Sequence, residues 1–151
     1  MSRQKSKTLA TWLAVVAGSL GMHRIYLFGH RDMLGWLHTV PTLAGLVGVF
    51  RTQNLGQDDQ LSWALLPLLG VMLSAGMLQA IVLGLTSDER WQEKFNPHWP
   101  LSETGWGPVL GVIVAVLVGG TILMSTVAYS GQRLFEWELG ATLQNSARLT
   151  A

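Results

Sequence analysis

Four long stretches of this chain contain no Lys, Arg, Asp or Glu: residues 8–23, 33–50, 61–87 and 104–132. A helix that crosses a bilayer needs about 20 predominantly apolar residues, because hydrocarbon offers no partner for an open backbone N–H or C=O. The last two stretches reach that length unaided, whereas the first two must borrow flanking residues or thin the bilayer locally. The pattern predicts an all-α polytopic membrane protein with four transmembrane helices.

The overall composition agrees with a membrane environment. Charged residues make up 13% of the chain, about half the share that is usual in a soluble domain. The formal net charge of +1 is too small to indicate a nucleic-acid partner. The chain has no Cys, which excludes disulfides, thiolate chemistry and iron–sulfur ligation.

The four predicted helices are arranged as two hairpins. Residues 1–52 form the first hairpin, 53–60 a polar loop, and 61–129 the second hairpin. Asp32 is expected to cap the second helix with its side chain. Thr86 and Glu89 fit a capping box, so an interfacial helix is expected within the connection 86–106. The tail, 130–151, is interpreted as a separate segment that can form a second interfacial helix.

Four spans place both termini on one side of the membrane. Six Lys and Arg residues then lie on the side of the termini and four lie on the opposite side. The positive-inside rule therefore predicts cytoplasmic termini.

A cationic-aromatic segment, residues 21–29, separates the first two stretches and is expected to be a tight turn at the membrane surface. Arg24, Arg31 and Asp32 could form an ion-pair clasp there, or bind a lipid phosphate or an acidic group of a partner. Simple snorkelling of the arginines to the headgroups is the alternative. The candidate interaction residues are Gly18, Gly21, His23, Arg24, Tyr26, Gly29, Arg31, Asp32, Gly35 and His38.

The histidines near this segment raise the question of a metal site. His23, His30 and His38 could converge with Asp32, but their spacing is not a recognised ligand pattern. A structural interpretation is preferred: His23 donates to carbonyls at the end of the first helix, and His38 forms a hydrogen bond across the hairpin. We therefore predict no metal and no cofactor.

Small residues recur at intervals of four in the third and fourth stretches. Such stripes allow helix backbones to approach closely, and packing drives helix association in lipid. They are interpreted as packing surfaces, either between the two helices or between copies of the chain. The residues are Gly76, Ala80, Gly84, Gly107, Gly111, Ala115 and Gly119.

The first third of the chain resembles the TM-two domain family. The resemblance covers about residues 7–51 and rests on Lys7, Gly18-Ser19-Leu20-Gly21, His23-Arg24-Ile25-Tyr26-Leu27, Gly29 and Gly35. Ile25 stands where the family usually has Phe, and Phe28 is inserted before Gly29. The whole chain is similar to a bacterial variant with four spans. The resemblance implies a two-helix membrane hairpin and no established activity. In animal members the Arg-containing turn is thought to face the cytosol, which conflicts with the charge count and leaves orientation open.

The distribution of polar residues bears on function. Every Asp and Glu lies outside the four stretches, and only His38 and Gln79 offer strong polar groups at depth, which disfavours a proton-coupled carrier. No catalytic motif is present. We predict a non-enzymatic interaction or scaffold protein of the bacterial inner membrane. Its expected partners are the lipid bilayer, anionic headgroups, and a membrane protein or a second copy. The alternatives are a small oligomeric channel or transporter, and a membrane enzyme or metal-binding protein.

Overall fold

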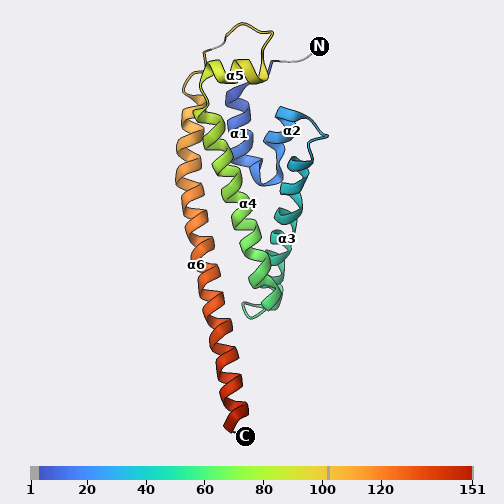
Figure 1. The fold of residues 1–151 in the computed structure, drawn as a ribbon, viewed down its shortest axis with the longest axis vertical. Coiled ribbons are helices and arrows are strands. Elements are labelled where there is room, and N and C mark those ends of the chain that lie inside the picture. Colours follow the sequence, from blue (N-terminus) through green and yellow to red (C-terminus); the bar gives the residue numbers. More distant parts are fainter. Residues whose placement is uncertain (1–3, 102, 151) are drawn as a thin grey trace.

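A computed structural model describes residues 4–101 and 103–150, and all elements in this part of the chain are helices (Figure 1). Three helices are long and apolar enough to cross a membrane: α3 (Met33–Leu55), α4 (Gln60–Leu85), and α6 (Gly107–Thr150) over its residues Gly107–Ser146. The prediction of an all-α chain compatible with a multi-pass membrane protein is confirmed.

The first predicted span is shorter than expected. Helix α1 (Lys7–Ala17) is followed directly by the 3₁₀ helix η1 (Gly18–Leu20), and the chain then reverses into α2 (Met22–Phe28). At a rise of about 1.5 Å per residue, α1 and η1 together extend about 20 Å, which is less than the hydrocarbon thickness of about 30 Å.

The expected turn at His23 and Arg24 is wrong, because both residues lie within α2. The reversal occurs at Gly21, whose φ of 73° falls in the left-handed region that favours glycine. A Cβ at Gly21 would lie 2.2 Å from the carbonyl oxygen of Gly35, so this position is also closed to side chains by the start of α3. The turn is therefore set by backbone geometry, and the polar residues follow it.

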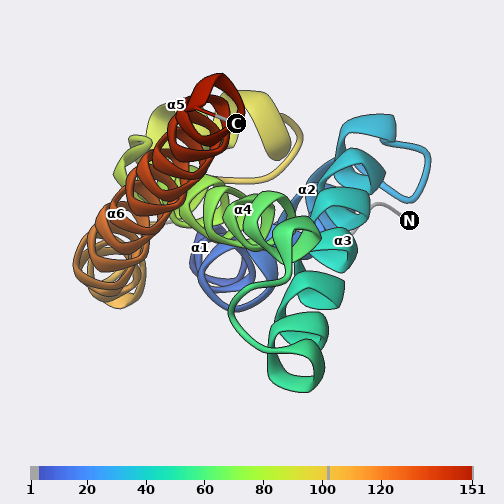
Figure 2. The same cartoon turned by 90° about the horizontal axis from the view of Figure 1, so that it is seen from below.

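Helix α4 is the central element and contacts α1, α3 and α6 (Figure 2). Helix α4 and η1 pack backbone to backbone, since a Cβ on Gly18 would lie 2.7 Å from the Cα of Gly76. Further along the same stripe, Ala80 is fully buried, and a Cβ on Gly84 would meet the side chains of both Val112 and Thr11.

The small residues of α6 lie against α1 and α4. Gly107 faces Thr8 and Gly111 faces Thr11, both on α1. Ala115 is fully buried in a core cluster with Ala14, Met77 and Ala80. Gly119 faces Met77. The two predicted stripes therefore meet at one three-helix contact, and α1 fills part of the space between them.

The connection after α4 contains the predicted short helix, α5 (Asp88–Phe95). Its N-cap is Ser87, whose side chain accepts a hydrogen bond from the backbone N–H of Arg90. The expected capping box of Thr86 and Glu89 is therefore absent: the helix starts one residue later, and the Thr86 hydroxyl donates to the carbonyl of Val82 within α4. Helix α5 lies across the end of the bundle where α1 begins (Figure 1).

The loop between α3 and α4 is shorter than the predicted 53–60, because α3 continues past Arg51 to Leu55. The Arg51 guanidinium donates to both carboxylate oxygens of Asp59, at 2.8 and 2.7 Å. This contact holds the pKa of Asp59 well below its usual range. Asp59 also caps α4 by accepting from the backbone N–H of Ser62.

The predicted separate tail, 130–151, is wrong as far as residue 150, because α6 runs without a break from Gly107 to Thr150. Its 44 residues correspond to about 66 Å of helix. Gly131 and Gly140 lie within the helix: a helical Gly costs only about 1 kcal/mol, and good helix formers follow Gly131 (Gln132, Arg133, Leu134) and adjoin Gly140 (Glu138, Leu139, Ala141). The C-terminal part of α6 projects beyond the other helices (Figure 1).

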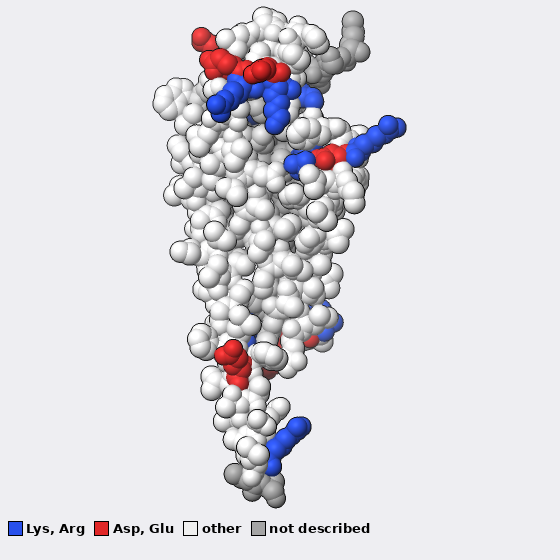
Figure 3. Space-filling model, viewed as in Figure 1, with Lys and Arg blue, Asp and Glu red and all other residues white. Residues whose placement is uncertain are grey.

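Charged residues gather toward the ends of the molecule on the face seen in Figure 3, with an uncharged surface between them. The beginning of α1 and α5 share one end, because the Lys7 ammonium contacts Asp88 at 2.5 Å. Arg51 and Asp59 mark the other end, where α3 passes into α4.

Candidate functional site

A chain of hydrogen bonds joins α2, α4 and α3 through His23, Gln79 and His38. The Nε2 of His23 contacts the Oε1 of Gln79, the Nε2 of Gln79 lies 2.9 Å from the Nε2 of His38, and the Nδ1 of His38 lies 2.8 Å from the carbonyl oxygen of Leu34. Carbonyl oxygens only accept, and an amide nitrogen only donates. The network therefore assigns the proton to Nε2 of His23 and to Nδ1 of His38.

The hydrogen bonds among His23, Gln79 and His38 satisfy nearly all the polar atoms of these three side chains. His23 is only 1% exposed, and burying such a ring without hydrogen bonds is costly. Its Nδ1 is the one atom of the three side chains that is buried without a partner. Because Gln79 serves both imidazoles at once, its side chain fixes the position of α2 and α3 on α4. The predicted bond of His23 to carbonyls of the first helix is replaced by this contact.

Arg24 and Asp32 form the expected ion-pair clasp beside this chain. The Nε of Arg24 donates to Oδ2 of Asp32 at 2.7 Å, and a second, longer bond joins Nη2 to Oδ1 at 3.4 Å. Asp32 occupies the N-cap position of α3, but its carboxylate is engaged by Arg24 and makes no capping bond. The Arg24 guanidinium lowers the pKa of Asp32 below its usual range. The Arg24 guanidinium also lies 5.1 Å from the ring centroid of Phe28.

Some of the remaining predicted site residues have structural roles, and others are exposed to the surroundings. The Tyr26 hydroxyl accepts from the backbone N–H of Ser6 at 2.8 Å. Gly29 ends α2 with a φ of 90°, and Gly35 lies against Gly21. Arg31, like its neighbour His30, is exposed. The structure brings together His23, Arg24, Asp32 and His38, and leaves Arg31 apart.

The structure also bears on the metal hypothesis. Within residues 4–101 and 103–150, no group of three or more His, Asp or Glu side chains is placed to hold a metal ion. His23 and His38 are separated by the Gln79 amide, with ring centroids 6.2 Å apart, and His30 is exposed.

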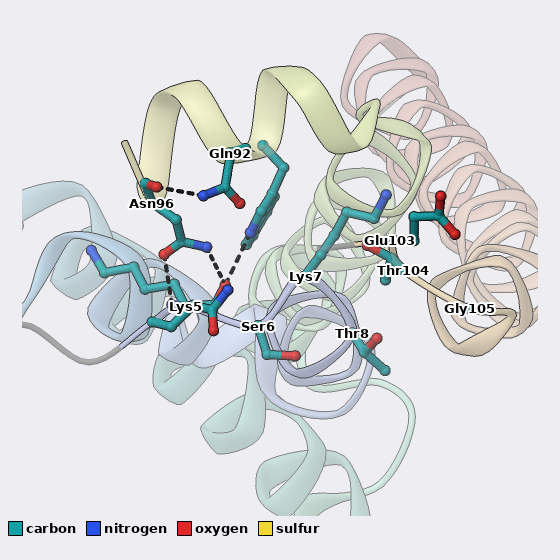
Figure 4. A pocket seen from close by; sticks show the side chains of 11 residues that line it. Lys5, Ser6, Lys7, Thr8, Gln92, Asn96, Glu103, Thr104 and Gly105 are labelled. Atoms are coloured by element: carbon teal, nitrogen blue, oxygen red, sulfur yellow. Dashed lines mark hydrogen bonds between the residues drawn. The ribbon is translucent and has the colours of Figure 1, made fainter. Parts of the chain in front are cut away.

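A second polar cluster, missed by the sequence reasoning, holds the N-terminal segment against α5 (Figure 4). The side chain of Asn96 accepts from the backbone N–H of Lys5 at 2.8 Å and donates to the carbonyl oxygen of Lys5 at 2.9 Å. The indole Nε1 of Trp91 donates to the same carbonyl at 3.0 Å. Asn96 thus pairs with the Lys5 backbone as a neighbouring strand would. In the sequence, Asn96 followed by Pro97 indicates only the end of a helix.

Lys7 and Asp88 extend this cluster. The Lys7 ammonium contacts Asp88 at 2.5 Å and donates to the Thr86 carbonyl at 2.9 Å. The hydroxyl and backbone N–H of Thr104 donate to the same carboxylate, at 2.6 and 2.9 Å. These contacts, led by Lys7, lower the pKa of Asp88 to about 2. A polar cleft of about 310 Å³ lies beside them, lined by the N-terminal segment, α5 and residues 103–105 (Figure 4).

Comparison of the chain with protein-family models, curated proteins and solved structures finds no match in any of the three. The resemblance of residues 7–51 to the TM-two domain family stays a prediction. The motif that carries it has a physical role here: its glycines shape the α1–α2 reversal, and its His and Arg bind the reversal to α3 and α4.

Proposed function

We propose that this chain is an integral protein of a bacterial inner membrane and acts by binding a membrane-protein partner or a second copy, without catalysis. The observation that carries the proposal is the C-terminal part of α6, which extends past the bundle with large apolar side chains in the open. Leu134, Phe135, Trp137, Leu139 and Leu143 are each 61 to 70% exposed. This segment lies beyond the charge-free run 104–132 and carries Arg133, Glu136 and Glu138, so we place its apolar side chains outside the hydrocarbon, where a large exposed apolar surface is typical of an interaction site.

The internal polar groups support a structural role for the sequence motif. His23, Arg24, Asp32 and His38 are engaged with one another or with Gln79. The channel alternative predicts a polar, water-lined path through His38, Gln79 and the hydroxyl-bearing residues Thr39, Ser74, Thr121 and Ser125. Thr121 is exposed on α6 and its hydroxyl bonds to Leu117 within its own helix, so these contacts give that alternative less support.

Contacts of the N-terminal segment with α5 support a topology that differs from the predicted one. We propose three crossings, by α3, α4 and α6, with α1, η1 and α2 entering from one side and returning to it. This departs from the predicted four spans, which would separate the N-terminal segment from α5. The bonds of Lys5 to Asn96 and of Lys7 to Asp88 support one shared side.

The positive-inside rule then orients the protein differently. Of the Lys and Arg residues that the structure describes, six lie on the shared side: Lys5, Lys7, Arg24, Arg31, Arg90 and Lys94. Three lie on the other: Arg51, Arg133 and Arg148. The N-terminal segment and α5 are therefore assigned to the cytoplasm, and the end of α6 to the opposite side.

Two experiments test these proposals. Cysteines introduced singly at Gln4, His98 and Asn145 of this Cys-free chain should be labelled from the cytoplasm, the cytoplasm and the outside, respectively. Labelling of Gln4 and Asn145 from one side, with His98 on the other, would restore the four-span prediction.

For the binding role, the tagged full chain is purified from native membranes after crosslinking. We expect a partner or a dimer with the natural sequence, and its loss when Trp137 and Leu143 are both replaced by Gln. The control is Gln144→Ala, which alters the same helix segment without removing apolar surface. Recovery of the bare protein in every case would refute the role.

A further inference from the structure

A groove of about 320 Å³ lies between α2, α4 and α5. Its wall on α4 is mostly apolar: Leu78 and Val82, which are 61% and 60% exposed, line it together with Leu83, and Gln79 is the polar residue among them. Phe28 from α2 and Phe95 from α5 also line it, with their rings in an edge contact at 5.9 Å between centroids. The groove is thus mostly apolar along α4 and ends at an aromatic pair.

The charged side chains that line the groove are both cationic, and one of them, Arg24, is paired with Asp32. The side chains that line it include Arg24 and Lys94 but no carboxylate. The Lys94 ammonium lies 5.3 Å from the Phe95 centroid, and Lys5 approaches the same ring at 5.9 Å. Among the ion pairs of residues 4–101 and 103–150, none includes Lys94 or Lys5. Two cations without an acidic partner therefore flank the aromatic end.

The position of the groove along the bundle matches a membrane boundary. Leu78 and Val82 lie one to two turns before α4 ends at Leu85, within a helix apolar enough to span. Lys94 and Phe95 lie at the end of α5, outside the three candidate spans. Acyl chains occupy the first environment and phosphates the second.

We propose that this groove binds one anionic phospholipid, with an acyl chain along Leu78 and Val82 and the headgroup phosphate at Lys94 and Arg24. The proposal rests on the membrane placement given above and is independent of the binding role of α6. Lys94 supplies the free charge. Arg24 adds its guanidinium edge that does not face Asp32, since only Nε and Nη2 bond to that carboxylate.

The test uses the purified full chain in a neutral detergent and native mass spectrometry with added phosphatidylglycerol or phosphatidylcholine. We expect the natural sequence to retain one phosphatidylglycerol in preference to phosphatidylcholine. Lys94→Gln should weaken that binding about fivefold, the effect of one cation near an anionic surface. Arg90→Gln removes the same charge from an exposed position on the same helix, and it should leave the affinity unchanged.

A second pair of variants tests the acyl part of the site. Val82→Trp fills the groove and should abolish retention, whereas Leu85→Trp adds the same bulk at an exposed position outside the lining and should not. Equal losses for Lys94→Gln and Arg90→Gln would show nonspecific charge attraction and overturn the proposal. Binding of inorganic phosphate as strong as that of phosphatidylglycerol would also overturn the proposal, because the site would then be a site for free anions.

Discussion

Asn96 binds both backbone groups of Lys5, 91 residues earlier in the chain. The side chain of Asn96 is 3% exposed, so neither its oxygen nor its nitrogen can exchange this contact for water without opening the structure. One amide thereby fastens the segment before α1 to the end of α5. The contact gives this end of the bundle a fixed arrangement in which Lys7 meets Asp88.

Asn96→Ala is expected to destabilise the protein by about 1–3 kcal/mol, because it leaves the backbone N–H of Lys5 without its partner. Thermal unfolding in detergent micelles measures the change. Asn54→Ala is the control, since Asn54 is exposed and bonds only within α3. Equal effects of the two variants would contradict a stabilising role for the contact between Asn96 and the Lys5 backbone.

Gly18→Ala is expected to destabilise by about 1–3 kcal/mol, because the added methyl would lie 2.7 Å from the Cα of Gly76 and must push η1 away from α4. Gly120→Ala has the opposite expected sign, with a gain of up to about 1 kcal/mol, since that helical position is open. The unfolding midpoints of the two variants should therefore move in opposite directions. A neutral Gly18→Ala would show that the two backbones are not in contact.

Gln79→Leu is expected to be among the most destabilising single substitutions, at about 2–4 kcal/mol. It removes the partner of both His23 and His38 while keeping the side-chain volume similar. His30→Ala, at an exposed position, serves as the control. A double-mutant cycle with His38→Leu should show coupling between the two sites. Strict additivity would mean that the chain of hydrogen bonds does not form.

Acid should weaken the clamp between Lys7 and Asp88. The pKa of Asp88 is lowered from 3.8 to about 2, so its contribution to stability is complete above pH 4 and is lost as the pH falls through 2. Unfolding midpoints measured from pH 5 to pH 1.5 should fall for the natural sequence. Asp88→Asn should lower the midpoint at pH 5 and flatten the fall, while Asp58→Asn, at an exposed loop position, should do neither.

The sequence allowed the long helices to be predicted, because α3, α4 and α6 each include a long run without charge, and hydrocarbon enforces helical structure on such a run. It did not reveal the reversal at Gly21. The same residues could form one short continuous span or a helix that reverses at its glycines, because the two structures have the same composition. The close contacts of Gly18 with Gly76 and of Gly21 with Gly35 select the reversal. Those contacts join distant segments that local sequence does not relate.

Only part of the candidate site could be predicted, again because local sequence does not relate distant segments. The Arg24–Asp32 clasp is local, since the residues lie eight positions apart, and the charge pattern indicated it. Gln79 and Asn96 act on residues 56 and 91 positions away. A polar residue on an apolar helix and an Asn at a helix end gave no indication of which partner each would meet. The continuous α6 was missed because polar residues after Tyr129 resemble a tail, although none of them ends a helix.

The contacts of Lys5 with Asn96 and of Lys7 with Asp88 have a consequence for biosynthesis. Ribosomes release the N-terminal segment long before α5 has been made, so α1 must wait for some ninety further residues before Asn96 and Asp88 reach it. During that interval α1 is too short to anchor itself across the bilayer, and its Lys7 has no counter-charge. In the proposed topology, assembly is completed only when α4 has inserted and α5 returns to the side of the N-terminal segment.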